Sequence, residues 1–232
     1  MKIGILGSGN MGRHLGLLWA ERGHDVLFGN RNVDRARDAA ALAARQCESG
    51  TLGDAAQFGD VLLHTARDVM PSGMGVDKSV FGGKILIDLN NSQMPGNLEF
   101  EPVVSSYAER FQEDVPSLRV VKAFNTIALE LFEHCPDAIR QYDVSVFVAG
   151  DDPAAKTIVH GLAEELGFTA LDSGGLRNAR LLESAADFYR YMVVRGGDGG
   201  IGLNSHISAH IISEAATRRL GGRSRSELRP RA

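Results

Sequence analysis

The chain has 232 residues, of which 44% are hydrophobic and 23% are charged, and its formal net charge is −4 at pH 7. This length and composition suit one large α/β domain, with or without a short appendage. The negative charge argues against a nucleic-acid partner, and no apolar run approaches the roughly 20 residues of a membrane span. Cys47 and Cys135 lack metal-ligand spacing, so we expect free thiols, no metal site and a cytoplasmic location.

The predicted elements alternate between strands and helices along most of the chain. Apolar runs typical of buried strands occur at residues 2–6, 25–28, 60–65, 84–88, 119–124, 143–149 and 169–171. Helical patterns are predicted at residues 13–22, 33–46, 105–113, 127–133 and 153–166. This alternation predicts an α/β fold with a doubly wound, mostly parallel Rossmann sheet and helices on both of its faces.

The pattern becomes helical after Gly174. Residues 178–195 predict one helix and residues 205–220 another, and the five glycines within residues 196–202 predict a flexible loop between them. We therefore expect a dinucleotide-binding Rossmann domain over residues 1–175. Residues 176–232 are predicted to form a short C-terminal helical extension that packs on the same domain.

A glycine-rich loop follows the first predicted strand and opens the first helix, at Gly7-Ser8-Gly9-Asn10-Met11-Gly12. In a dinucleotide loop of this kind, Gly7 permits the tight turn, Gly9 lets the backbone approach a pyrophosphate, and Gly12 lets the helix pack close to the strand. An ordinary glycine-rich turn is the alternative, because 27 glycines can produce the spacing by chance. The strand-to-helix context favours the binding loop, with the anion facing the helix N-terminus.

The end of the second predicted strand indicates which dinucleotide binds. An NAD enzyme usually places Asp or Glu about 20 residues after the loop, on the ribose 2′-hydroxyl. Here the residues after Phe28 and Gly29 include no acid until Asp34. Arg31 and Arg35 are four residues apart at the start of the next helix, and with the Asn30 amide they predict a 2′-phosphate site and hence NADP. A solvated helix start with scattered arginines is the alternative.

Further motifs make the chain resemble the NADPH:F420 oxidoreductase family, a group that also includes the cytosolic domains of the six-transmembrane metalloreductases. The resemblance covers nearly the whole chain and includes the phosphate loop. Its other motifs are Gly29-Asn30-Arg31, residues 121–126, Gly150-Asp151-Asp152, residues 175–183 and the loop at 196–202. It implies an NADPH-dependent oxidoreductase that transfers a hydride between NADP and a deazaflavin, coenzyme F420. We expect a homo-oligomer, specifically a dimer, whose partner is a small-molecule redox acceptor.

The resemblance also implies roles for particular residues. The pyrophosphate would be wrapped by Ser8, Gly9, Asn10 and Met11, on the turn that Gly7 and Gly12 allow. The 2′-phosphate would be held by Asn30, Arg31 and Arg35. The cofactor would be followed along its length by Thr65, Ala66 and Met70. Its nicotinamide end would be approached by Asn91, Asn125 and Leu129. The acceptor would be bordered by Gly199 and Gly200.

Three departures from the family pattern leave the acceptor open. Deazaflavin enzymes tend to carry His-Thr-Ile-Pro where this chain has residues 125–128, a proline-containing stretch where it has residues 88–92, and a proline at the position of Arg67. The Asp-x-Asn-Asn and Lys-x-Phe-Asn patterns are closer to the metalloreductase branch. An NADPH-dependent reductase of a flavin, a metal chelate or a small organic substrate is therefore one alternative, and a non-catalytic NADPH-sensing module is another.

The acid–base residues of alcohol dehydrogenases are not recognisable in the sequence. No tyrosine is followed four residues later by lysine, and no lysine occurs after Lys156. We therefore expect no single essential catalytic acid or base, since two redox rings carry their own hydride chemistry and need mainly to be positioned. His64 could donate a proton or pack within its strand. His206 and His210 have the spacing of two metal ligands but no evident third, so a solvated or interface helix face is expected.

Overall fold

The computed structural model describes residues 1–44, 47–133 and 136–196. Its centre is an eight-stranded sheet with the strand order β3-β2-β1-β4-β5-β6-β7-β8. The strands are β1 Lys2–Leu6, β2 Asp25–Gly29, β3 Glu48–Gly50, β4 Val61–His64, β5 Ile85–Asp88, β6 Arg119–Lys122, β7 Ser145–Gly150 and β8 Thr169–Asp172. All neighbouring strands pair in parallel except β6 and β7, which are antiparallel. The predicted doubly wound, mostly parallel sheet is therefore confirmed.

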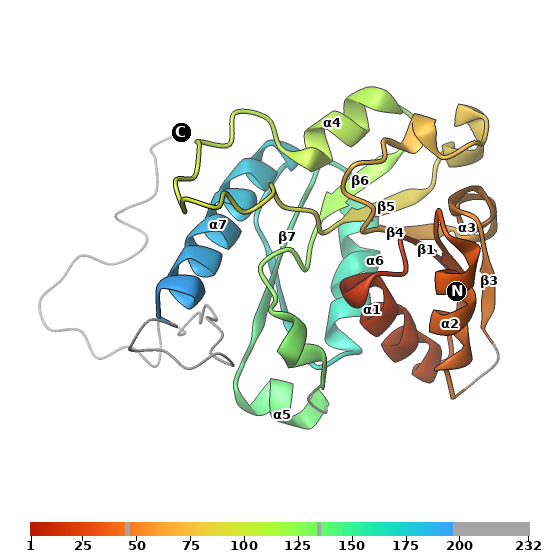
Figure 1. The fold of residues 1–232 in the computed structure, drawn as a ribbon, viewed down its shortest axis with the longest axis horizontal. Helices are drawn as coiled ribbons and strands as arrows, with labels where there is room; N and C mark the ends of the chain where they lie inside the picture. Colours follow the sequence, from red (N-terminus) through yellow and green to blue (C-terminus); the bar gives the residue numbers. More distant parts are fainter. Residues whose placement is uncertain (45–46, 134–135, 197–232) are drawn as a thin grey trace, which may run out of the picture.

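Helices cover both faces of this sheet (Figure 1). The α-helices are α1 Asn10–Glu21, α2 Val33–Ala41, α3 Leu52–Phe58, α4 Tyr107–Asp114, α5 Pro136–Gln141, α6 Pro153–Glu164 and α7 Ala179–Gly196. Short 3-10 helices occur at Pro71–Gly73, Lys78–Phe81, Leu129–Glu133 and Leu176–Asn178. None of these described helices has both the length and the apolar character that crossing a membrane would demand.

Alternating side chains of the strands build two separate cores. Ile3 and Ile5 face the side covered by α1, α2 and α6, where Trp19 is fully buried. Leu6 and Leu62 face the other side, which is covered by α3 and α4. Because strand side chains alternate between faces, apolar residues at consecutive strand positions are what a sheet covered on both faces requires.

Several elements differ from the predictions. The helix predicted at residues 33–46 is shorter, since α2 ends at Ala41, and the one predicted at residues 127–133 is a 3-10 helix over Leu129–Glu133. The elements β3, α3 and α5 were not predicted. The three residues of β3 are too few for a periodic pattern, and the seven-residue α3 is marked mainly by the capping box of Thr51 with Asp54. The loop at 196–202 and the helix at 205–220 lie almost entirely outside the described residues, and the division at residue 175 stays a prediction.

Candidate functional site

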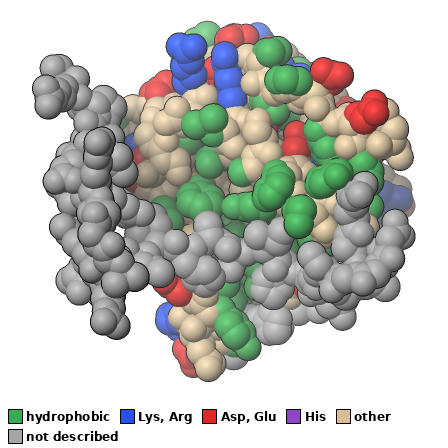
Figure 2. All heavy atoms as spheres, turned by 90° about the vertical axis from the view of Figure 1, so that its left-hand side faces the viewer, with side chains coloured by type: hydrophobic (Ala, Val, Ile, Leu, Met, Phe, Trp, Pro, Cys, Tyr) green, Lys and Arg blue, Asp and Glu red, His purple; other side chains and the backbone are tan. Residues whose placement is uncertain are grey.

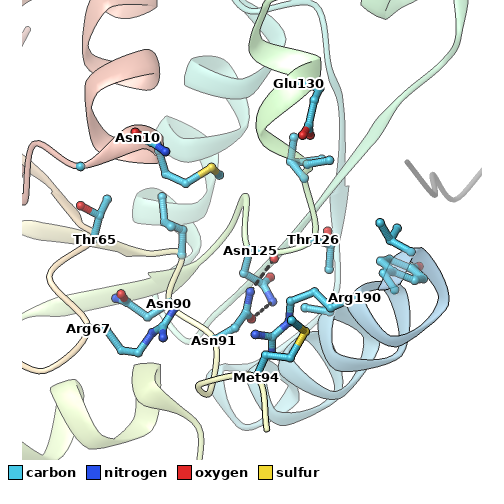
Figure 3. Close-up of a pocket in the computed structure, with 18 of the residues that line it drawn as sticks. Asn10, Thr65, Arg67, Asn90, Asn91, Met94, Asn125, Thr126, Glu130 and Arg190 are labelled. Atoms are coloured by element: carbon cyan, nitrogen blue, oxygen red, sulfur yellow. Dashed lines mark hydrogen bonds between the residues drawn. The ribbon is translucent and has the colours of Figure 1, made fainter. Parts of the chain in front are cut away.

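A cleft of about 650 Å³ opens beyond the carboxyl ends of β1, β4, β5 and β6. The strand order reverses at β1, which lies between β2 and β4, and such a switch point is where open α/β sheets bind ligands. Figure 3 shows Asn10 and Thr65 on one side of the cleft, with Arg190 of α7 on the other. The cleft therefore joins the phosphate loop to the last described helix.

The phosphate loop requires glycine at two of its positions. Gly7 has a φ of +116°, and a Cβ placed there would lie 2.5 Å from Thr65 Oγ1. A Cβ on Gly12 would lie 2.1 Å from the Gly7 carbonyl oxygen. At Gly9, in contrast, a Cβ would meet no protein atom within 4 Å. Gly7 and Gly12 thus shape the turn, while Gly9 borders open space.

The amino end of α1 is free to bind an anion. Its first internal bond runs from the Arg13 amide to the Gly9 carbonyl at 2.8 Å, so the amides of residues 10–12 have no acceptor within the helix. Gly9 offers no capping side chain, and the first turn contains no acid, whereas α2, α3, α4 and α6 each begin with a side-chain cap. The pyrophosphate of a dinucleotide fits this uncapped end and the open space before Gly9.

The carboxyl end of β2 carries the residues predicted to hold the 2′-phosphate. The Asn30 amide donates to Ser8 Oγ at 2.9 Å, which ties the end of β2 to the phosphate loop. Arg31 and Arg35 are exposed and have no ion pair within residues 1–44, 47–133 and 136–196. The nearest acid in sequence, Asp34, is already paired with Arg37 at 2.8 Å. Both guanidinium groups are thus available to a phosphate.

One detail of that prediction was wrong. Arg31 and Arg35 were expected to share one face at the start of a helix, but Asn32 is the N-cap of α2, so Arg31 precedes the helix and only Arg35 lies in its first turn. The Asn32 side chain accepts from the Asp34 amide at 3.0 Å, which fixes where the helix begins.

The structure brings six of the predicted site residues together in the cleft wall. These are Gly9, Asn10, Met11, Thr65, Asn91 and Asn125. The predicted residues that do not line the cleft are Gly7, Ser8, Gly12, Asn30, Arg31, Arg35, Ala66, Met70 and Leu129. Of these, Gly7, Ser8 and Gly12 belong to the phosphate loop itself. Gly199 and Gly200 lie outside the described residues.

Asn91 and Asn125 bond to each other at the base of the cleft (Figure 3). The Asn91 side-chain amide donates to the Asn125 carbonyl at 2.8 Å, and the Asn125 amide donates to Asn91 Oδ1 at 2.9 Å. The Asn125 amide also donates to the Leu182 carbonyl of α7 at 2.9 Å. These bonds fix both side chains and leave Asn125 Oδ1 as a buried acceptor without a partner in the described part of the chain.

A strained residue places this pair. Phe124 has a φ of +61°, a left-handed conformation that is unusual for a bulky side chain. Its fully buried ring packs edge-on against Trp19 and Phe168, with centroids 5.9 and 6.2 Å away. The predicted strand at 119–124 therefore ends early, at Lys122, and the chain turns so that Asn125 reaches the cleft.

Sequence reasoning missed much of the cleft wall. Among the missed residues, Arg67, Asn90, Met94 and the segment 126–128 lie on loops after strands, and Glu130 lies in the 3-10 helix Leu129–Glu133. Others belong to α7, namely Ala186, Tyr189, Arg190, Val193 and Val194. Their spacing of three or four residues is that of one helix face and was visible in the sequence. The spacing alone could not show that this face of the helix lines the cleft.

His64 ends β4 but does not line the cleft. It is fully buried, with Nε2 2.9 Å from the Val69 carbonyl and Nδ1 3.0 Å from the Asn90 amide, and its ring centroid lies 4.3 Å from that of Phe111. Burial lowers its pKa to about 4, against an opposing influence of the Asp88 carboxylate. His64 is thus a neutral, packed strand histidine.

We expect His64 to make folding stability depend on pH. Its folded pKa of about 4 lies below the ordinary value of 6.5, so below pH 6.5 the unfolded chain binds the proton more readily. Stability should fall between pH 6.5 and 4, by up to about 3 kcal/mol at 1.36 kcal/mol per pKa unit. Urea unfolding across this range should show a shallower fall for His64→Gln than for the wild type. Equal slopes would contradict the prediction.

No group of three or more His, Cys, Asp or Glu side chains in the described ranges is arranged to hold a metal ion. His206 and His210 lie outside these ranges, so their role stays a prediction.

Comparisons with known proteins agree with this geometry. The family model described as "NADP oxidoreductase coenzyme F420-dependent" matches residues 2–92, which include the phosphate loop and Asn91. A solved structure titled as a putative F420-dependent NADP reductase from Arthrobacter sp. superposes with a TM-score of 0.67 at 26% identity. The superposition covers 85% of this chain and 95% of the chain in that solved structure.

Two curated relatives are similar over most of the chain. Metalloreductase STEAP3 of Rattus norvegicus is 32% identical over 184 residues, which are 79% of this chain but only 36% of that protein. The chain thus spans about a third of that relative. The F420-dependent NADP reductase of Methanothermobacter marburgensis is 31% identical over 201 residues, covering 79% of this chain and 88% of the relative. By that identity over nearly the whole relative, the chain belongs to the family of F420-dependent NADP oxidoreductases.

Proposed function

We propose that this NADP-dependent oxidoreductase transfers a hydride between NADPH and a deazaflavin of the coenzyme F420 class. The observation that carries the proposal is the continuity of the cleft, which runs from the phosphate loop at Gly9 to the side of α7 that bears Tyr189 and Val193. A volume of about 650 Å³ is in the range of pockets that enclose a small organic molecule. A nicotinamide and a second flat ring could therefore occupy it together.

The composition of the cleft wall supports a positioning role. Among the described residues, the lining includes no His, Lys, Cys or Asp, and its ionisable side chains other than arginine are Glu130 and Tyr189. NADPH, when bound, supplies the hydride chemistry itself. The residues of this chain would hold the two partners in contact and exclude water, as expected for a site without an essential acid or base.

A second candidate function is reduction of a flavin or a metal chelate. The observation that favours it is the 32% identity to STEAP3, which is named a metalloreductase. Asn125 and Arg67, both in the cleft wall, are positions where the chain departs from the deazaflavin-type pattern.

An acceptor panel separates these candidates. Under anaerobic conditions, NADPH would be mixed with coenzyme F420, with the same deazaflavin lacking its phosphate-bearing tail, with FAD and with ferric citrate, and its oxidation followed by absorbance. We expect kcat/KM to be highest for coenzyme F420. Faster reduction of FAD or ferric citrate would favour the second candidate, and NADPH binding without oxidation by any acceptor would indicate a sensing module.

Arg67 is expected to bind an anionic part of the acceptor. It lines the cleft, is exposed and has no ion pair in the part of the chain that the structure describes, whereas Arg190 is bonded to Asp187 and to the Ser92 carbonyl. Figure 3 shows it extending toward the segment of Asn90 and Asn91. One charge-assisted hydrogen bond contributes about 1.5–3 kcal/mol, or roughly 10- to 100-fold in binding.

We therefore expect Arg67→Ala to raise the KM for coenzyme F420 about 10-fold. The KM for the tail-less deazaflavin and the Kd for NADPH should change less than about twofold. Arg140→Ala, which removes an exposed arginine paired with Asp137, is the control. A rise in the NADPH Kd instead would assign Arg67 to the cofactor, and no change in any constant would remove it from the site.

Three further parts of the proposal rest on the sequence. Gly199 and Gly200 would border the acceptor, residues 176–232 would pack on the Rossmann domain, and the enzyme would act as a cytoplasmic homodimer. Turnover of Gly199→Leu/Gly200→Leu would test the first, and sedimentation equilibrium would test the oligomeric state.

A further inference from the structure

The helix α7 carries the far wall of the cleft, yet its inner side buries little apolar surface. The apolar side chains that it buries are Ala179, Leu182 and Ala186. Glu183 and Asp187, only 2% and 5% exposed, occupy the same side. Apolar burial is non-directional, so it does not by itself fix the position of a helix along its own axis relative to the elements it packs on.

Larger apolar side chains of α7 point away from the sheet. Leu181 is 66% exposed and Phe188 is 58% exposed. Figure 2 shows hydrophobic side chains gathered on the side of the molecule where α7 lies. The position of α7 on the sheet is therefore set largely by the polar contacts of its inner side.

Lys122 is the centre of those contacts. It ends β6 and is fully buried, and its ammonium group donates to Asp88 Oδ2 at 2.8 Å, to Glu183 Oε1 at 2.6 Å and to the Asn90 carbonyl. These three bonds use all three hydrogens of the ammonium group. One side chain thereby joins the end of β5, the loop that follows it and the second turn of α7.

Further hydrogen bonds continue along the same side of α7. The Asn125 amide donates to the Leu182 carbonyl at 2.9 Å, Ser92 Oγ donates to Asp187 Oδ1 at 3.2 Å, and Arg190 donates to the Ser92 carbonyl at 2.8 Å. We call the contacts of Lys122, Asn125 and Ser92 with α7 the polar seam. Because hydrogen bonds are directional, the seam specifies one register for the helix.

The register of α7 determines where its cleft-facing side chains lie. Ala186 and Arg190 follow Glu183 by three and seven residues, on the same side of the helix, and both line the cleft. A slip of one residue along a helix moves a side chain by about 1.5 Å and rotates it by about 100°. Hydride donor and acceptor must be held roughly 3–3.5 Å apart, so even a small shift would misplace the acceptor.

We propose that Lys122 is a positioning residue, which sets the register of α7 through Glu183 and so places the acceptor against the nicotinamide without touching either ring. The inference rests on the proposed function only in requiring an acceptor that α7 faces. Loss of Lys122 alone would leave the buried carboxylates of Asp88 and Glu183 without their cation, a strongly destabilising change that could unfold the protein. The test variant therefore removes the charge of Lys122 and the charge of Glu183 together.

The test variant is Lys122→Met/Glu183→Gln. A glutamine at 183 retains a side-chain oxygen for the Tyr107 amide, which Glu183 accepts from at 2.8 Å. The matched control is Arg180→Met/Glu109→Gln, because Arg180 and Glu109 form a bidentate pair at 2.7 Å that joins the start of α7 to α4, away from the cleft wall. Glu183→Gln alone, which keeps Lys122 and its bonds to Asp88 and Asn90, is the conservative variant.

Single-turnover hydride transfer and the Kd for NADPH are then measured for each variant. We expect the Lys122→Met/Glu183→Gln rate to fall at least about 10-fold, with the Kd within about twofold of the wild type. The control and Glu183→Gln should stay within about threefold in rate. A rate near the wild-type value in the folded test variant would overturn the proposal, as would a Kd that rises as much as the rate falls.

Amide hydrogen exchange gives a readout that needs no acceptor. In the test variant, or in Glu183→Ala if the test variant does not fold, exchange should accelerate over residues 182–194 relative to the control and to Glu183→Gln. Unchanged exchange there would overturn the role of Lys122 even if the acceptor proves to be a flavin. Failure of the wild type to reduce a deazaflavin, with accelerated exchange in the variant, would overturn only the proposed function.

Discussion

Gly9→Val is expected to weaken NADPH binding severely while the protein still folds. Gly9 has a φ of −72°, which any residue adopts, and its Cβ would meet no protein atom within 4 Å. The added side chain would instead occupy the space before the amides of residues 10–12, where the pyrophosphate fits. A rise of at least about 100-fold in Kd, or about 3 kcal/mol, is expected from a fluorescence titration, with the melting temperature nearly unchanged.

Two glycine variants serve as controls for this result. Gly12→Val should lower the melting temperature, because its Cβ would lie 2.1 Å from the Gly7 carbonyl oxygen. Gly161→Val on α6 should change neither property, since a Cβ there also meets nothing within 4 Å and Gly161 does not line the cleft. Normal NADPH affinity in a folded Gly9→Val protein would mean that the loop is only structural.

Arg31→Ala/Arg35→Ala is expected to remove the preference for NADPH over NADH. Each charge-assisted contact with the 2′-phosphate should contribute about 1.5–3 kcal/mol, so each arginine accounts for roughly 10- to 100-fold of the preference. NADH lacks that phosphate, so its affinity should stay nearly constant and provides the internal reference. Both cofactors would be titrated against the wild type, both single variants and the double variant.

Arg37→Ala is the matched control, because Arg37 lies on α2 with Arg35 but is paired with Asp34 at 2.8 Å. Its removal should change the preference little. Equal affinity of the wild type for both cofactors would refute the 2′-phosphate site. A double variant that loses affinity for NADH as much as for NADPH would show that the arginines act on the fold instead.

The parts of the fold that were predictable depend on local patterns. Residues 2–6 and 85–88 are short apolar runs flanked by turns, and both are buried strands. By contrast, β3 is made of Glu48, Ser49 and Gly50, which have no strand pattern of their own and become a strand only by pairing with β2. Tertiary pairing, rather than propensity, decides such a segment.

The candidate site divides in the same way. The phosphate loop was predictable because its glycines, the strand before it and the helix after it are contiguous in the sequence. Lys122 stood in a recognised motif, but its three acceptors come from residues 88, 90 and 183, which only the packed structure brings together. The cleft-facing side of α7 could not be predicted for the same reason, because helical periodicity does not indicate which part of the protein each side of the helix will face.

The uncapped amino end of α1 has a consequence for the stability of the protein without bound cofactor. A capping Ser, Thr, Asp or Asn typically stabilises a helix by about 1 kcal/mol, and Gly9 supplies no such side chain. A bound pyrophosphate would take the place of the missing cap, and a ligand that binds only the folded chain stabilises it further as its free concentration rises above Kd. Resistance to heat and proteolysis should therefore follow the NADPH supply, so that a cell poor in reduced cofactor would lose this protein faster than one in which the cofactor is abundant.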